Sequence, residues 1–119
     1  MLSQTNSADI IIDKWSYING KFVDGDNVQV AIHPFPAQNK TIVQIHLKGE
    51  HGWTVAESDY FYVITDGAAI FSLEGGESVV CVNGESILVH AGTPYSYRPE
   101  QPGDIVEATL FMNHLWSGE

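Results

Sequence analysis

The stretch GESILVHAGTPYSY, from Gly84 to Tyr97, decides the fold class of this chain. A turn is predicted at Asn83-Gly84, where the stretch begins, because asparagine and glycine tolerate the positive φ angles of tight turns. A short apolar strand is predicted over 86–89, a second turn at Ala91-Gly92 and another strand over 94–97. Such short strands divided by turns are typical of an all-β domain.

The rest of the chain shows the same organisation. Asn19-Gly20 is a strong hairpin signal, and Pro34 and Pro36 are expected to end a strand because proline cannot donate to a β-ladder. No segment of helical length carries a three-to-four residue apolar period. Further strands are predicted over 15–18, 21–23, 28–33, 41–47, 60–65, 68–73, 78–82 and 105–112. This pattern favours a β-barrel or jelly roll.

The composition fits one globular domain. The chain has 119 residues, of which 44% are hydrophobic and 17% charged, and a chain of this size can bury a self-sufficient core. Residues 1–9 are small and polar and are expected to be loosely held. The domain is therefore predicted to comprise residues 10–119.

The charge balance limits the possible partners. Fifteen acidic residues oppose five lysines and arginines, so the formal net charge is −10. Such a chain repels nucleic acid phosphates and anionic membrane surfaces, so we expect neither nucleic acid nor a membrane as a partner.

The sequence also favours a cytoplasmic location. Cys81 is the only cysteine and sits in the apolar run Val79–Val82, so it is interpreted as a buried thiol. We find no apolar stretch near the roughly 20 residues of a membrane span. The N-terminus lacks the basic and apolar regions of a signal peptide.

The stretch from Gly84 resembles the second sequence signature of the cupin family. In that signature a glycine-acid turn opens a short strand that ends in Pro-Ala-Gly-x-Pro-His, and the final histidine usually binds a metal inside a β-barrel. Here Tyr95 takes the place of that histidine, and His90 takes the place of the first proline. The segment 60–71 looks like the second half of the first cupin signature. The resemblance covers about residues 40–112 and implies a cupin-type jelly-roll barrel.

The resemblance also implies where a metal would be held. Counting back from Gly67 puts three of the four usual ligand positions on Thr54, Ala56 and Tyr60, and the second signature puts the fourth on Tyr95. None of these is a good ligand for a divalent transition metal, which prefers imidazole, thiolate or carboxylate. The prediction is therefore no metal and no cofactor. A relocated metal site built from His46, Glu50 and His51 is the alternative.

Tyrosines at alternate positions indicate a possible binding pocket. Side chains two residues apart in a strand share a face, so Tyr60 lies with Tyr62, and Tyr95 with Tyr97. Aromatic rings and hydroxyls suit a sugar or a small oxygenated molecule, although tyrosines can also simply fill a barrel. The predicted pocket residues are Thr54, Ala56, Tyr60, Tyr62, Tyr95 and Tyr97.

These observations leave three functions open. The first is a binding module that holds a small polar organic ligand, sugar-like or an organic acid, without the usual metal. The second is a metal-independent isomerase or epimerase, cyclase or lyase, with Tyr60, Tyr95 and His46 as catalytic candidates. The third is a metal-dependent enzyme with the relocated site. Alternation along 43–47 places His46 opposite three aliphatic side chains and thus outside the barrel, which favours binding.

A homodimer is also predicted. The resemblance to cupins implies it, because members of that family pair through sheet faces, often with an exchanged N-terminal strand. The apolar run 10–12 and Trp15 would suit such an exchange, because an isolated apolar edge strand needs a cover.

Overall fold

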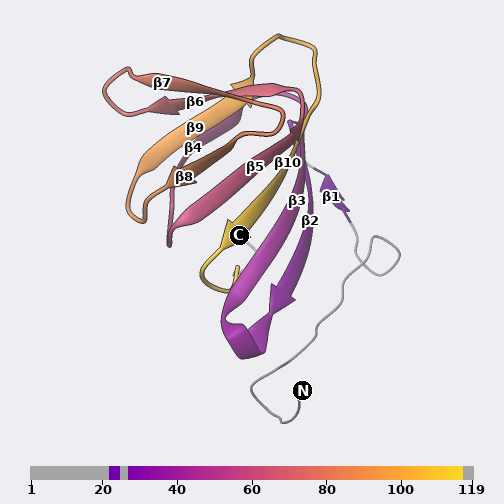
Figure 1. Cartoon of the computed structure of the whole chain (residues 1–119), viewed down its shortest axis with the longest axis vertical. Helices are drawn as coiled ribbons and strands as arrows, with labels where there is room; N and C mark the ends of the chain where they lie inside the picture. Colours follow the sequence, from indigo (N-terminus) through magenta and orange to yellow (C-terminus); the bar gives the residue numbers. More distant parts are fainter. Residues whose placement is uncertain (1–21, 25–26, 117–119) are drawn as a thin grey trace.

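The computed structural model describes residues 22–24 and 27–116 and consists of two antiparallel sheets (Figure 1). The six-stranded sheet has the order β1-β2-β3-β10-β5-β8, and the four-stranded sheet has the order β4-β9-β6-β7. The strands are β1 (Phe22–Asp24), β2 (Val28–Phe35), β3 (Lys40–Leu47), β4 (His51–Val55), β5 (Tyr60–Asp66), β6 (Ala68–Leu73), β7 (Ser78–Val82), β8 (Ser86–Val89), β9 (Pro94–Pro99) and β10 (Val106–Met112).

The all-β prediction is confirmed. Apart from a short 3₁₀ turn at Pro36–Gln38, the regular structure of the described residues is entirely strand. The predicted segment 1–9, the apolar run 10–12, the strand 15–18 and the Asn19-Gly20 hairpin lie outside the described residues.

Two strands differ from the prediction. β2 continues through Pro34 to Phe35, whereas the prolines were expected to end it. Since β1 pairs only with residues 29–31 of β2, Pro34 has β3 on one side and no described strand on the other. A missing N–H is tolerated at such an edge. β4 was not predicted, because its sequence has no clear alternation of apolar and polar residues.

The core lies between the two sheets and follows the period of two that strands impose. On β3 the side chains of Val43, Ile45 and Leu47 are buried, and on the neighbouring β10 the inward positions are Val106, Ala108, Leu110 and Met112. Burying one such aliphatic side chain contributes about 1.5–3 kcal/mol. The four-stranded sheet covers this face with aromatic residues, including Phe71 and Tyr97.

The opening turn of the Gly84 stretch joins β7 to β8 and anchors them to β5. Gly84 has φ of 92°, which an L side chain rarely adopts. Its N–H donates to the carbonyl oxygen of Ile64 at 2.8 Å. The Glu85 carboxylate accepts a hydrogen bond from the Val82 N–H at 2.9 Å. The turn therefore fixes how β8 joins the larger sheet.

Candidate functional site

A cavity of about 150 Å³ lies between the two sheets. One wall is aliphatic and is built by β2, β3 and β10, from Val28, Val30, Val43, Ile45, Leu110 and Met112. Apart from Val55, the rest of the lining is aromatic or polar and is formed by His51, Thr54, Glu57, Tyr60, Tyr62, Tyr95, Tyr97, His114 and Trp116. An apolar cavity with a few convergent polar groups is the usual form of a small-molecule site.

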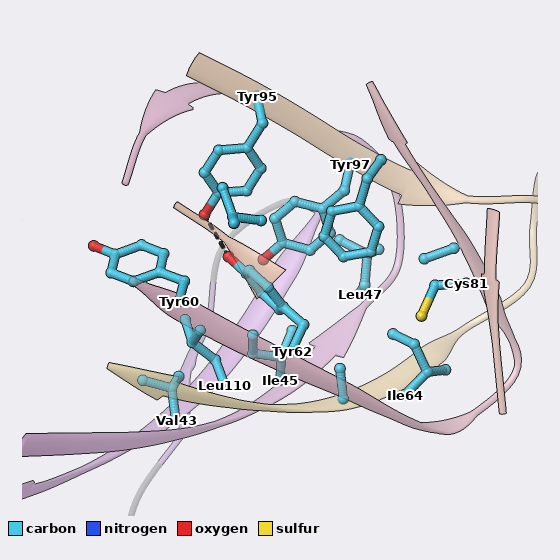
Figure 2. Packing of buried hydrophobic residues seen from close by; sticks show 14 of the residues in the cluster. Val43, Ile45, Leu47, Tyr60, Tyr62, Ile64, Cys81, Tyr95, Tyr97 and Leu110 are labelled. Carbon is cyan, nitrogen blue, oxygen red and sulfur yellow. Dashed lines mark hydrogen bonds between the residues drawn. The ribbon is translucent and has the colours of Figure 1, made fainter. Parts of the chain in front are cut away.

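Two tyrosine hydroxyls meet across this space. Tyr62 on β5 and Tyr95 on β9 belong to opposite sheets, and their hydroxyl oxygens are 2.5 Å apart (Figure 2). The Tyr97 ring stacks on that of Tyr95, with centroids 6.1 Å apart, and on that of Phe71 at 5.0 Å. A hydroxyl pair uses one of its two protons in the internal bond, so the other can be donated to a ligand.

Burial keeps these tyrosines protonated. Desolvation raises the pKa of Tyr62 well above its ordinary value and is also the main cause of the raised pKa values of Tyr95 and Tyr97. The pKa of Tyr60 is raised as well, mainly by burial. Each hydroxyl is therefore neutral near pH 7 and acts as a hydrogen-bond donor or acceptor, not as a base.

A β-bulge in β4 turns His51 into the cavity. His51 pairs with Tyr97 and Thr54 pairs with Tyr95, so Gly52 and Trp53 together oppose one residue of β9. In a regular strand, positions 51 and 54 are three residues apart and would face opposite sides of the sheet. With the bulge, both line the cavity, while Trp53 is 57% exposed. Bulges re-aim side chains in this way and often occur next to active sites.

The contacts of His51 determine its tautomer. Its Nδ1 lies 2.9 Å from the carbonyl oxygen of Gly52, and a carbonyl can only accept, so Nδ1 carries the proton. The neutral ring then has its lone pair on Nε2, which no described residue binds. The ring stacks on Tyr97 with centroids 4.9 Å apart and an interplanar angle of 14°.

A second histidine, His114, also lines the cavity. His114 Nε2 lies 3.2 Å from Glu57 Oε1, and its Nδ1 lies 2.7 Å from Ser58 Oγ. Its ring stacks on Tyr60 with centroids 5.8 Å apart, and its carbonyl oxygen accepts a hydrogen bond from the buried Thr41 hydroxyl at 2.8 Å. Both ring nitrogens of His114 thus have protein partners.

Most of the predicted pocket residues meet in this cavity. Thr54, Tyr60, Tyr62, Tyr95 and Tyr97 line it.

Ala56 and the catalytic candidate His46 lie elsewhere. Ala56 is buried in the core and does not line the cavity. His46 alternates with the inward Ile45 and Leu47, so it lies on the other face of β3, where its Nδ1 is 3.3 Å from Gln29 Oε1. His46 therefore cannot reach a ligand in the cavity.

Sequence reasoning missed His51, Glu57, His114 and Trp116 as lining residues. A glycine inside a strand is a known sign of a bulge, so Gly52 was the available signal for His51. Nothing local in the sequence indicates His114, because its partner Ser58 is 56 positions away.

The donor atoms present do not fit a transition metal. Of the four positions implied by the cupin resemblance, Ala56 has no donor, Thr54 has a hydroxyl, and Tyr60 and Tyr95 are neutral phenols. The relocated alternative is contradicted as well, because His46 and His51 lie on different faces. Residues 27–116 contain no group of three or more His, Cys, Asp or Glu side chains that could hold a metal ion.

No protein-family model matches the sequence, and a comparison with curated protein sequences gave no match either. Solved structures are similar. A cupin superfamily protein from Desulfitobacterium hafniense DCB-2 matches with a TM-score of 0.63 at 11% identity, over 76% of this chain and 80% of that chain. This chain has a cupin fold.

Two cupin-fold enzymes are also similar in structure. The hydroxypropylphosphonic acid epoxidase from S. wedmorenis matches with a TM-score of 0.76 at 7% identity, over 85% of this chain and 59% of that chain. The match thus spans less than two thirds of the epoxidase. The nucleoside dehydratase Pac13 matches with a TM-score of 0.70 at 17% identity, over 85% of this chain and 81% of that chain. A tyrosine-to-phenylalanine variant of the Streptomyces protein was solved with uridine.

No helix among the described residues is long and apolar enough to cross a membrane.

Proposed function

We propose that the cupin barrel binds a small, oxygenated organic molecule, sugar-like or an organic acid, in the cavity between its sheets and without the usual metal. One observation carries the proposal. The Tyr62–Tyr95 hydroxyl pair stands in a cavity with one aliphatic wall, where it can orient a polar ligand while that wall packs against the carbon skeleton of the ligand.

The size of the cavity restricts the ligand. Its 150 Å³ correspond to about five water molecules at the volume that each occupies in the liquid. This is below the roughly 300–1,000 Å³ of sites for drug-sized ligands. The expected ligand is therefore a sugar with few carbon atoms or a similarly small compound, or one part of a larger molecule.

Binding can be tested with a variant that fills the cavity. We expect small sugars or hydroxy acids to shift tyrosine resonances of the wild-type protein in NMR titrations. Val30→Phe, which adds a ring at the aliphatic wall, should abolish these shifts, and Val79→Phe is the matched control because Val79 is exposed on β7. If no compound of either class shifts the tyrosine resonances, the proposed function is wrong.

A metal-independent enzyme is the second candidate, and His51 favours it. A proton-transfer reaction needs a group in the cavity that can accept a proton. His46 does not meet this requirement, but His51 does, since it lines the cavity with a lone pair on Nε2. The dehydratase activity of the structurally similar Pac13 is compatible with catalysis in a barrel of this shape.

The homodimer remains a proposal. Phe61, Leu88 and Phe111 are direct neighbours across β8, β5 and β10 on the outer face of the larger sheet. Each is about 40% exposed, and a second copy of the chain could cover such an apolar row. Light scattering should give twice the monomer mass, and Phe111→Glu should reduce it to that of the monomer. A wild-type monomer at micromolar concentration would exclude the dimer.

The cytoplasmic location is likewise proposed. The free thiol of Cys81 is buried, and such thiols are typical of proteins from reducing compartments.

A further inference from the structure

We propose that this cavity is an acid–base site that enolises an uncharged hydroxy-carbonyl compound, with His51 as the proton acceptor and the Tyr62–Tyr95 pair as the donor to the developing enolate oxygen. The inference rests on the proposed function, because it requires that a small oxygenated molecule binds in the cavity.

His51 is the cavity group best placed to accept a proton. The tyrosine hydroxyls keep their protons, since burial raises their pKa values. Glu57 and His114 contact each other, and Ser58 contacts the second nitrogen of His114. The hydrogen bond from His51 Nδ1 to the Gly52 carbonyl leaves the lone pair on Nε2. A neutral imidazole of this kind is the commonest general base in enzymes.

The surrounding structure holds the His51 ring in place. The bulge places it on the cavity side of β4, the Gly52 carbonyl fixes one edge, and Tyr97 supports one face. Tyr97 is itself supported by Phe71, which stacks on it with an interplanar angle of 9°. A base that is fixed before the substrate binds loses little conformational freedom in the reaction.

The tyrosine pair supplies the second half of the chemistry. A donor that stays neutral in an apolar site stabilises an oxyanion more strongly than it would in water. Tyr62 and Tyr95 share one proton between their oxygens, and the other can point toward a ligand oxygen. The raised pKa values indicate that this proton is shared with the oxyanion in a hydrogen bond and is not transferred to it.

The charge of the cavity selects an uncharged substrate. Among the described residues that line it, none is lysine or arginine, and Glu57 contributes a carboxylate. The whole chain carries a formal charge of −10. A phosphorylated or carboxylated compound would meet repulsion without a cationic partner. Within the proposed ligand classes, a sugar-like carbonyl compound is therefore favoured over an organic acid.

The step balances without an oxidant or a second reactant. The C–H bond next to the carbonyl breaks, and its proton moves to Nε2 of His51. The electron pair forms a C=C bond, and the carbonyl oxygen takes up the negative charge under the tyrosine hydroxyls. When the imidazolium returns a proton to carbon, the carbonyl forms again, with exchange of the proton or inversion at that carbon.

Proton exchange with solvent tests the inference directly. Dihydroxyacetone in D₂O serves as the uncharged probe, and ¹H NMR follows the loss of its CH₂ signal while tyrosine shifts report binding. We expect exchange above the buffer rate, reduced about 10²-fold or more in His51→Gln and about 10²-fold in Tyr95→Phe. His90→Gln should keep the wild-type rate, because His90 is exposed and does not line the cavity. Dihydroxyacetone phosphate should exchange more slowly than the uncharged probe.

The outcomes separate the two proposals. Dihydroxyacetone that binds without exchange overturns the acid–base site and leaves the binding function intact. Exchange that persists in a folded His51→Gln protein, checked by circular dichroism, overturns the role of His51. Faster exchange of the phosphorylated probe overturns the preference for uncharged substrates. Absence of both binding and exchange overturns the inference together with its premise for this class of compound.

Discussion

The hydroxyl oxygens of Tyr62 and Tyr95 lie 2.5 Å apart and join the two sheets of the barrel from the inside. Each belongs to a residue that is almost fully buried. The same hydrogen bond therefore stabilises the barrel and places two polar groups in its cavity.

This link predicts coupling between the two positions. Tyr62→Phe and Tyr95→Phe should each lower the free energy of unfolding by about 1 kcal/mol, because each leaves the remaining hydroxyl without its partner. The double variant should lose less than the sum of the two, since it removes both hydroxyls together. Urea unfolding of the four proteins measures this difference, and additive losses would contradict a direct interaction.

The raised tyrosine pKa values predict a loss of stability at alkaline pH. In the unfolded chain these tyrosines ionise near pH ~10, whereas in the folded chain Tyr62, Tyr95 and Tyr97 hold their protons to higher pH. The folded state thus binds more protons above pH ~10, so the free energy of unfolding falls as pH rises from there. Below that pH, the contribution of these groups to the free energy of unfolding does not change with pH.

Two measurements check this behaviour. Absorbance at 295 nm should show that a group of tyrosines ionises at the same pH at which the native circular dichroism signal is lost. The urea concentration at the midpoint of unfolding should decrease as the pH is raised from about 10 to 11. Ionisation of every tyrosine near pH ~10 with the fold intact would show that burial does not protect them.

Two turn glycines allow a matched test of backbone strain. Gly67 has φ of 88°, and an added Cβ would lie 3.4 Å from the Ile105 carbonyl oxygen and 3.4 Å from Val106 Cγ2. Gly84 has φ of 92° but no neighbour within 4 Å of such a Cβ. Gly84→Ala should cost about 1–2 kcal/mol for the left-handed backbone alone. Gly67→Ala should cost a similar amount, because contacts of 3.4 Å are ordinary van der Waals contacts; a clearly larger loss in thermal unfolding would mean that these contacts carry a penalty of their own.

Cys81 is expected to be unreactive in the folded protein. Its side chain is buried, and burial, with a smaller effect of the Glu85 carboxylate, raises the pKa of its thiol. A thiol-specific reagent should therefore react at least about tenfold faster in denaturant than in native buffer. Equal rates would place the thiol in contact with solvent.

Much of the fold could be predicted from local sequence, and the reasons are visible in single strands. The alternation of Val43, Ile45 and Leu47 matches a strand with one buried face, and the turn at Gly84 requires a residue that accepts positive φ. β4 could not be predicted in this way, because its bulge breaks the period of two.

The candidate site was predictable only in part. The two tyrosines on β5 and the two on β9 each lie two residues apart, which predicts that each pair shares a face of its strand. The resemblance to the cupin family predicted that this face lies inside the barrel. The contacts of His114 with Ser58 and Thr41 join positions far apart in the chain, which no local pattern reveals. The aliphatic wall likewise combines strands that only the sheet order brings together.

The bulge at Gly52 and Trp53 lets β4 hold one extra residue without turning His51 away from the cavity. Removal of either residue would leave His51 and Thr54 two positions apart, so regular alternation would keep both side chains on the cavity side of the strand. In related barrels, a one-residue gap at this place would therefore be compatible with a histidine that faces the interior. An alignment without that gap would compare His51 with a residue on the outer face, so the gap, usually ignored as loop variation, would decide which positions of the site are compared.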